Sequence, residues 1–373
     1  MNEEKSSRYH RLKRHASVLS LVVTAALWAS LLLTGASATL RDVSRAIAGS
    51  SATAIVAVYA VLFILLQEAV TFPIAYYRAF VLERQYGLSM EPLSAWLRDH
   101  LKAVLVAAAL AIAAAEIVYA TLERWPRWWW FASATVFVGA TVLLAKLAPI
   151  LLLPIFYRFK PLDRHSLRAR LIALSERAGV PVLGVYEWGL GEKTRRANAA
   201  LVGTGRTRRI LVSDTLLQQY SEDEIEVILA HELGHHVHRD IFNALVLDVG
   251  LLLTGCYVAA VALNAWWRPL GLAAPTDVAG LPLLLLTAGA GSLLITPAVN
   301  AFSRANERRA DRYALTLTRQ PAAFVSAMRR LAAQNLAEER PSRAVLWLFH
   351  THPPIADRID AAKAFADETR RIA

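Results

Sequence analysis

Six apolar segments, each long enough to cross a bilayer as a helix of about 20 residues, constrain this chain more than any other feature. Composition agrees, because charged residues make up only 19% of the chain and hydrophobic residues 55%, whereas soluble domains carry about 25% charged residues. A soluble or disordered protein is therefore excluded, and we expect a mostly α polytopic membrane bundle of about six spans. The segments lie at roughly 16–40, 46–67, 103–122, 128–157, 241–267 and 278–303.

The basic residues predict the orientation of these spans. The net charge is +11, and lysine and arginine are unevenly distributed among the connections. In membrane proteins basic connections stay in the cytoplasm, so the excess does not indicate a nucleic-acid partner. We expect both termini in the cytoplasm and the protein in a bacterial inner membrane. The connections rich in basic residues are the N-terminus (Lys5, Arg8, Arg11, Lys13, Arg14) and 78–102 (Arg78, Arg84, Arg98, Lys102), against Arg41, Arg45, Arg124, Arg127 and Arg268 in the others.

The two polar segments that remain predict a small cytoplasmic α+β portion. Its strands are expected at 180–188, 198–203 and 209–213, and a helix at 164–178. A capping box of Ser221 and Glu224 opens a further helix at Glu222, which we expect to run unbroken into the fifth span. The expected organisation is 1–157, a four-span membrane region; 158–240, a catalytic segment; 241–303, a two-span hairpin; and 304–373, C-terminal helices.

The helix that is expected to begin at Glu222 carries the motif His231-Glu232-Leu233-Gly234-His235. Histidines at i and i+4 share one helix face and can bind one zinc ion, with Glu232 beside them as a general base. A chance match is expected roughly 0.01 times in such a chain, and the alternative is a solvated polar helix face. The single cysteine, Cys256, excludes a cysteine-based zinc site.

Glu307 is the expected third zinc ligand. The fifth and sixth spans form an antiparallel hairpin, so His235 and Glu307 lie about 9 Å and 6 Å from the same membrane face, at a rise of 1.5 Å per residue. Asp311, one turn after Glu307, suits support of a ligating imidazole or proton transfer. The alternative is salt bridging of Glu307 and Asp311 within an arginine-rich helix.

Four motifs resemble the type I CAAX prenyl protease family of integral-membrane zinc endopeptidases, to which the heat-shock membrane proteases are related. The likeness covers the chain from about residue 70 onward, and it implies a zincin-like fold for the polar, catalytic portion. The motifs are His231–His235, Ser303–Asp311 (SRANERRAD), Thr351–Ile359 (THPPIADRI) and Lys193–Leu217 around Asn198-Ala199, and the segments 77–100 and 148–162 resemble the prenyl protease branch.

The resemblance implies His231, His235 and Glu307 as ligands of one Zn²⁺ per chain, Glu232 as catalytic base and Asp311 as the family's aspartate. It also implies that His352 and Arg358 stabilise the oxyanion, and that substrate lies extended along Asn198 and Ala199. Eukaryotic members have seven spans around a large chamber, whereas six are expected here.

The predicted function is zinc-dependent hydrolysis of peptide bonds in membrane-associated or hydrophobic peptides, with prenylated CAAX-type peptides as one option. Two alternatives are a quality-control protease of the heat-shock type and, from another class, a metal or ion transporter that uses His231, His235 and Asp248. A catalytically silent scaffold is a third. Glu116, Lys146 and Asp248 lie within spans, where charge is costly, and indicate a hydrated space. The expected partners are a peptide and the bilayer.

Overall fold

The structure, a computed structural model, describes residues 2–151, 153–191, 194–203, 205 and 208–372. Leu152 and Lys193, which belong to two of the segments quoted above, lie outside the described residues. Six described helices are long and apolar enough to cross a membrane, as the sequence predicts. They are α1 (Asn2–Leu33), α3 (Ala52–Tyr76, continued by η1, Tyr77–Val81, and α4, Leu82–Gln85), α5 (Leu93–Arg124), α6 (Trp129–Leu151), α11 (Asp240–Trp266) and α12 (Leu281–Thr318).

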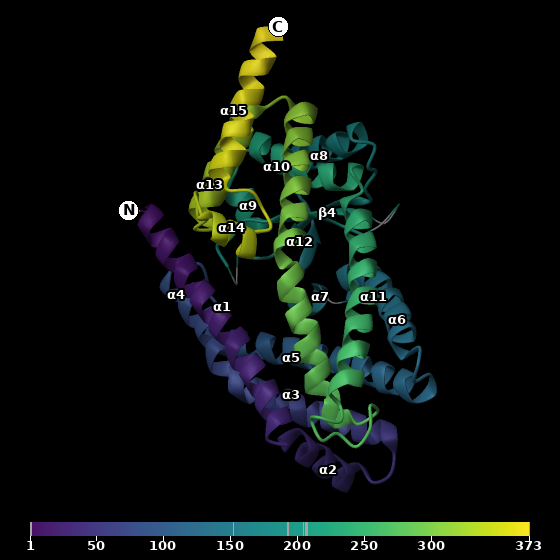
Figure 1. The fold of residues 1–373 in the computed structure, drawn as a ribbon. Helices are drawn as coiled ribbons and strands as arrows, with labels where there is room; N and C mark the ends of the chain where they lie inside the picture. Colours follow the sequence, from purple (N-terminus) through teal and green to yellow (C-terminus); the bar gives the residue numbers. More distant parts are fainter. Residues whose placement is uncertain (1, 152, 192–193, 204, 206–207, 373) are drawn as a thin grey trace.

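The six spans pack as a ring in which each helix contacts two others. The order around the ring is α1, α3, α5, α6, α11 and α12, and α12 closes it against α1 (Figure 1). Residues 291–295 of α12 are all exposed, and five consecutive residues cover every face of a helix. This stretch of α12 therefore packs tightly against no neighbouring span. Of the charged residues within the spans, Lys146 and Asp248 are also exposed.

The ends of the first two spans differ from the prediction of 16–40 and 46–67. Gly35 and Gly49 both have positive φ angles of about 75° and 72°, a conformation that glycine adopts without strain. They bound a separate short helix, α2 (Ala36–Ala48), and the next span begins only after Ser51, whose side chain caps α3. Neither break contains a charged residue, so the distribution of charge along the chain could not locate them.

The polar portion, residues 158–240 and 304–373, contains a four-stranded sheet in the order β1-β2-β4-β3. Strands β2 and β4 are parallel, and the other pairs are antiparallel. Helices and strands enclose one core that includes Leu171, Ile210, Ile225 and Phe324. The elements are β1 (Phe159–Pro161), α8 (His165–Arg177), β2 (Gly184–Trp188), β3 (Ala199–Val202), β4 (Arg209–Ser213), α9 (Asp214–Gln219), α10 (Glu222–Val237), α13 (Pro321–Gln334), α14 (Arg343–Phe349) and α15 (Ile355–Ile372), with α7 (Leu153–Phe156) and η3 (Val278–Gly280) beside the spans.

The helix with the histidine motif does not run unbroken into the fifth span, so that prediction is wrong. Its start is as expected, because Ser221 and Glu224 form the capping box. Its end is a break at Arg239, which has a φ of 56°, and α11 starts at Asp240. The sequence shows no glycine or proline here, and Arg239 adopts a left-handed conformation that its type rarely takes. The break turns Asp240 back toward α10.

Candidate metal and catalytic site

Close packing of α10 against α12 builds the site. The contact depends on Gly234, because a Cβ atom at this position would lie 3.1 Å from Cα of Ala310. Such a distance is shorter than most Cβ contacts, and the atom it meets belongs to the backbone, so a larger residue would require the two helices to separate by a few tenths of an ångström. The glycine inside the histidine motif thus lets α10 approach the stretch of α12 that carries Glu307 and Asp311.

Three possible metal ligands meet at this crossing. Nε2 of His231 lies 3.2 Å from Nε2 of His235 and 3.2 Å from Oε2 of Glu307. Nε2 of His235 lies 3.4 Å from Oε1 of Glu307. One ligand atom from each residue falls within 4.8 Å of the others.

The donor set fits a zinc ion. Nitrogen and oxygen ligands bind zinc at about 2.0–2.1 Å, so two ligands of a tetrahedral site lie about 3.3–3.4 Å apart. The three distances are close to this value, with Oε2 of Glu307 nearest His231 and Oε1 of Glu307 nearest His235. Oε2 of Glu307 is buried and accepts no hydrogen bond of good geometry from the described residues, although two imidazoles lie close to it. An unsatisfied buried carboxylate oxygen among imidazole nitrogens is suited to a cation.

A carboxylate orients each imidazole from behind. Nδ1 of His231 lies 2.8 Å from Oδ1 of Asp311, and Nδ1 of His235 lies 2.8 Å from Oδ2 of Asp240. Such contacts fix the tautomer that leaves Nε2 free to bind metal. Asp240 is held in turn by Arg309. Sequence reasoning missed Asp240 because a continuous helix would carry it away from His235.

The charges in this cluster compensate one another. Burial alone would lower the pKa of His231, but contacts with Asp311 and Glu307 outweigh it and raise the pKa to about 9. Burial would raise the pKa of Glu307, but His231, His235 and His352 hold it well below its usual range. A metal that binds at Nε2 must displace a proton from His231, so binding is coupled to proton release.

Asp240→Ala is expected to weaken zinc binding about 10–100-fold. The carboxylate of Asp240 contacts Nδ1 of His235, and such a contact sets the orientation and basicity of a ligating imidazole. A chelator-competition titration measures the affinity. Asp248→Ala, on the same helix α11 but exposed, is the matched control and should leave the affinity unchanged. Equal zinc affinity in Asp240→Ala and the parent protein would contradict this role.

Glu232 lies next to His231 on α10, and burial raises its pKa above the usual value. The charges of His231, His235, Glu307 and His352 all act on it, so its carboxyl group is near the ligands. His352 precedes α15 and is exposed, and its Nδ1 lies 2.8 Å from Oε2 of Glu307. The structure therefore brings both residues to the cluster, His352 on its open side.

Arg358 is placed differently from the expectation for an oxyanion donor. It is bound to both oxygens of Asp311, with Nε 2.8 Å from Oδ2, and its Nη2 is 3.5 Å from Nδ1 of His231. It thus lies behind the imidazole, on the side away from Nε2. These contacts favour a role for Arg358 in orienting Asp311 and His231. For Asp311 they favour support of the imidazole, one of its two expected roles.

Strand β3, with Ala199 at its start, is one of the two edge strands of the described sheet. Its inner edge pairs with β4: Ala199 is opposite Val212, and the carbonyl of Asn198 accepts a 2.9 Å hydrogen bond from Ser213. In an antiparallel pair alternate residues point their backbone groups to the other edge, which makes Ala199 and Leu201 the outward-facing positions. Helix α10 packs against β3, so this edge lies beside the histidine helix.

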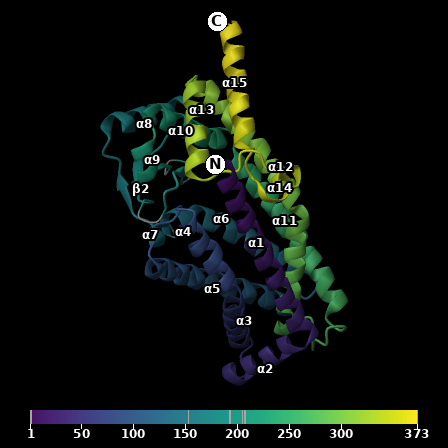
Figure 2. The same ribbon diagram turned by 90° about the vertical axis from the view of Figure 1, so that its left-hand side faces the viewer.

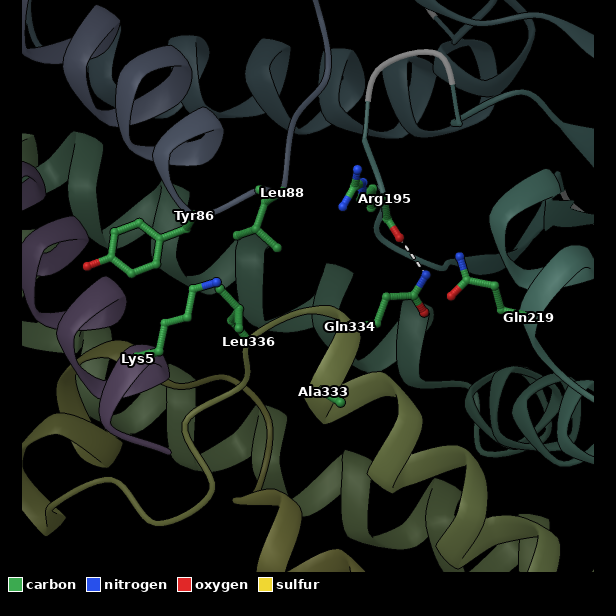
Figure 3. Close-up of a pocket in the computed structure, with 9 residues that line it drawn as sticks. Lys5, Tyr86, Leu88, Arg195, Gln219, Ala333, Gln334 and Leu336 are labelled. Atoms are coloured by element: carbon green, nitrogen blue, oxygen red, sulfur yellow. Dashed lines mark hydrogen bonds between the residues drawn. The ribbon is translucent and has the colours of Figure 1, made fainter. Parts of the chain in front are cut away.

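A cavity of about 490 Å³ lies at the segment that leads into β3. Figure 3 shows Lys5 and Leu88 on one side, and Arg195, Gln219 and Gln334 on the other. No residue of the metal cluster lines this cavity, so it is not the site of chemistry. Beside it, Glu83 accepts hydrogen bonds from Tyr9, Lys13 and Arg196, which ties the start of α1 to the segment before β3.

Two family models match the chain. The model described as peptidase family M48 matches residues 161–366, and the model described as CAAX prenyl protease N-terminal, five membrane helices, matches residues 2–158. The boundary between them falls where the membrane region meets the polar portion.

Individual relatives agree with the family models. The chain is 29% identical to the uncharacterized metalloprotease YhfN of Bacillus subtilis, over 80% of this chain and 71% of that protein. It is 26% identical to the probable CAAX prenyl protease 1 of Schizosaccharomyces pombe, over 80% of this chain but only 63% of that protein.

The fold also matches a solved structure, the crystal structure of S. mikatae Ste24p. The TM-score is 0.84 at 21% sequence identity, and the match covers 97% of this chain and 88% of that one. At this identity the match shows the fold. The resemblance inferred from the motifs is confirmed: the chain belongs to peptidase family M48 and carries the N-terminal membrane region of the CAAX prenyl proteases.

Proposed function

We propose that this membrane metalloprotease is a zinc endopeptidase with one Zn²⁺ per chain, held by His231, His235 and Glu307. The observation that carries the proposal is the convergence of one ligand atom from each of these residues, all within 4.8 Å of one another, next to Glu232. When bound, zinc would polarise the scissile carbonyl and make water more acidic. No nucleophilic side chain is needed.

Glu232 acts as the general base in this proposal. Its carboxylate takes a proton from the attacking water and returns it to the leaving amine. His352, exposed on the open side of the cluster, can donate a hydrogen bond to the oxyanion that develops on the carbonyl. Asp311 and Arg358 keep His231 in its ligating orientation from behind.

The substrate class follows from the strand edge and the membrane. An extended peptide can add to the outer edge of β3 through main-chain hydrogen bonds, which tolerate varied side chains. Six spans beside the site favour membrane-associated or hydrophobic peptides, and the relatives named CAAX prenyl proteases support prenylated peptides as one option. A heat-shock type of quality control would use the same chemistry on other substrates.

Hydrolysis is expected to require several residues on both sides of the scissile bond, because strand addition gains affinity with each main-chain hydrogen bond. A series of internally quenched peptides of two to ten residues would measure kcat/KM against length. We expect kcat/KM to rise at least tenfold between the shortest and longest peptides. Efficient hydrolysis of a dipeptide would contradict binding along β3.

A transporter is less well supported. Asp248 is eight residues beyond Asp240 on α11, about 12 Å along the helix axis, whereas Asp240 already contacts His235. The cluster thus does not extend along α11 into the span.

Proteomic comparison of membranes that hold the parent protein or a Glu232 variant would identify substrates and separate the two protease options.

For orientation we propose that the termini and the polar portion face the cytoplasm of a bacterial inner membrane, on the basis of the lysine and arginine counts. Reporter fusions after residues 215 and 373 should both give the cytoplasmic signal. A periplasmic signal from either fusion would overturn this orientation.

A further inference from the structure

Helix α14 exposes three consecutive large apolar side chains. Trp347, Leu348 and Phe349 are 54%, 49% and 45% exposed, and no residue of this helix is buried. Single exposed apolar residues are common, but a contiguous group of this size marks a surface that contacts another phase or molecule.

The position of α14 is fixed by side chains of α12. Nδ2 of Asn300 donates to the carbonyl of Trp347 at 3.0 Å. Nη1 of Arg304 donates to the carbonyls of Leu346 and His350 at 3.0 and 2.7 Å. Both side chains are buried, and a cation at the C-terminal end of a helix also interacts favourably with the helix dipole. The apolar side chains are thus held in place and do not belong to a frayed segment.

The attachment points place α14 at the level of the membrane surface. The uncharged part of the sixth span ends at Ser303, and Arg304 is its first charged residue. α14 therefore lies where α12 leaves the hydrocarbon region. Tryptophan and other aromatic residues are enriched at this depth. Arg340 and Arg343, both exposed, precede the apolar group and suit lipid phosphates.

α14 lies beside α12, on the side of this helix that is opposite α11. Figure 1 shows it between α12 and the N-terminal half of α1, and Figure 2 again shows it close to α12. The apolar group thus lies at the rim of the ring of spans.

We propose that α14 is an in-plane membrane anchor. Trp347, Leu348 and Phe349 insert into the boundary between headgroups and acyl chains, in the leaflet next to the polar portion. His352 follows Phe349 by three residues and contacts Glu307. The anchor therefore holds the segment that carries His352 against the bilayer surface while Arg304 holds it against α12.

Nitroxide accessibility tests the insertion directly, without any activity measurement. Because Cys256 is the single cysteine, a Cys256→Ser background permits one label per protein. Leu348→Cys or Phe349→Cys would be labelled in vesicles of phosphatidylethanolamine and phosphatidylglycerol. The ratio of collision with oxygen to collision with a water-soluble nickel chelate is then measured. Leu294→Cys, 85% exposed within the span, is the lipid control, and Lys363→Cys on α15 is the aqueous control.

We expect the ratio at both α14 positions to approach that of Leu294→Cys and to exceed that of Lys363→Cys at least about threefold, because insertion excludes the chelate. A ratio equal to that of Lys363→Cys at both positions would overturn the proposal. So would an apolar ratio that appears only after a 20-residue hydrophobic peptide is added, which would make α14 a peptide-binding surface. Spin–spin broadening that disappears on dilution with unlabelled protein would show contact with a second copy and would also overturn it.

Discussion

Glu232→Gln is expected to lower the rate of peptide hydrolysis about 10²–10⁴-fold, the usual loss when a general base is removed. The substitution keeps the size of the side chain and removes its basicity. Glu232 is not among the three grouped ligand residues, so zinc should stay bound at the parent stoichiometry. The measurements are kcat/KM on a quenched decapeptide and zinc content by mass spectrometry.

Two outcomes of this substitution discriminate between mechanisms. Hydrolysis at the parent rate would rule out Glu232 as the base. If the parent protein shows no peptidase activity and ion flux is abolished by the same change, a transporter would be favoured. Glu222→Gln, at the start of the same helix, is the matched control and should retain full activity.

His231→Ala and Glu307→Ala are expected to lose both zinc and activity. Each removes one of three protein ligands, and two ligands hold zinc much more weakly than three. Near-stoichiometric zinc in the parent protein should fall to a small residual fraction in either variant, and hydrolysis should fall at least as far as in Glu232→Gln.

His238→Ala is the control for the histidine variants. His238 is three residues after His235, and its ring packs against Tyr313, away from the cluster. Zinc content should therefore match that of the parent protein. Full zinc occupancy in Glu307→Ala would show that the third ligand is another residue.

Features with a strong local pattern were predictable from the sequence. The six spans follow from the length of the apolar segments, and the start of α10 follows from a capping box formed by neighbouring residues. The meeting of His235 and Glu307 was also predictable, because a helical hairpin brings together residues that lie at similar distances from its membrane edge, and the break at Arg239 does not separate the two. Each of these predictions depends on helix periodicity or on bilayer thickness.

Features that depend on single backbone angles or on distant packing were not predictable. The breaks at Gly35 and Arg239 leave the hydrophobic pattern unchanged, yet the second one brings Asp240 to His235. The position of Arg358 behind His231 depends on how α15 packs against α12, and 127 positions of the chain separate Arg358 from His231. An arginine that donates to an oxyanion and an arginine that donates to an aspartate look the same in the sequence.

The closure of the ring by α1 and α12 has a consequence for biogenesis. The first and the last span to leave the ribosome are neighbours, so the ring stays open until synthesis of the membrane region is complete. Glu307 also follows His235 by 72 residues, and both flanking spans must insert before the two can meet. At 5–20 residues per second this interval is about 4–14 s. A nascent chain thus carries its histidines without a working protease, and ribosome stalling before α12 yields an inert product.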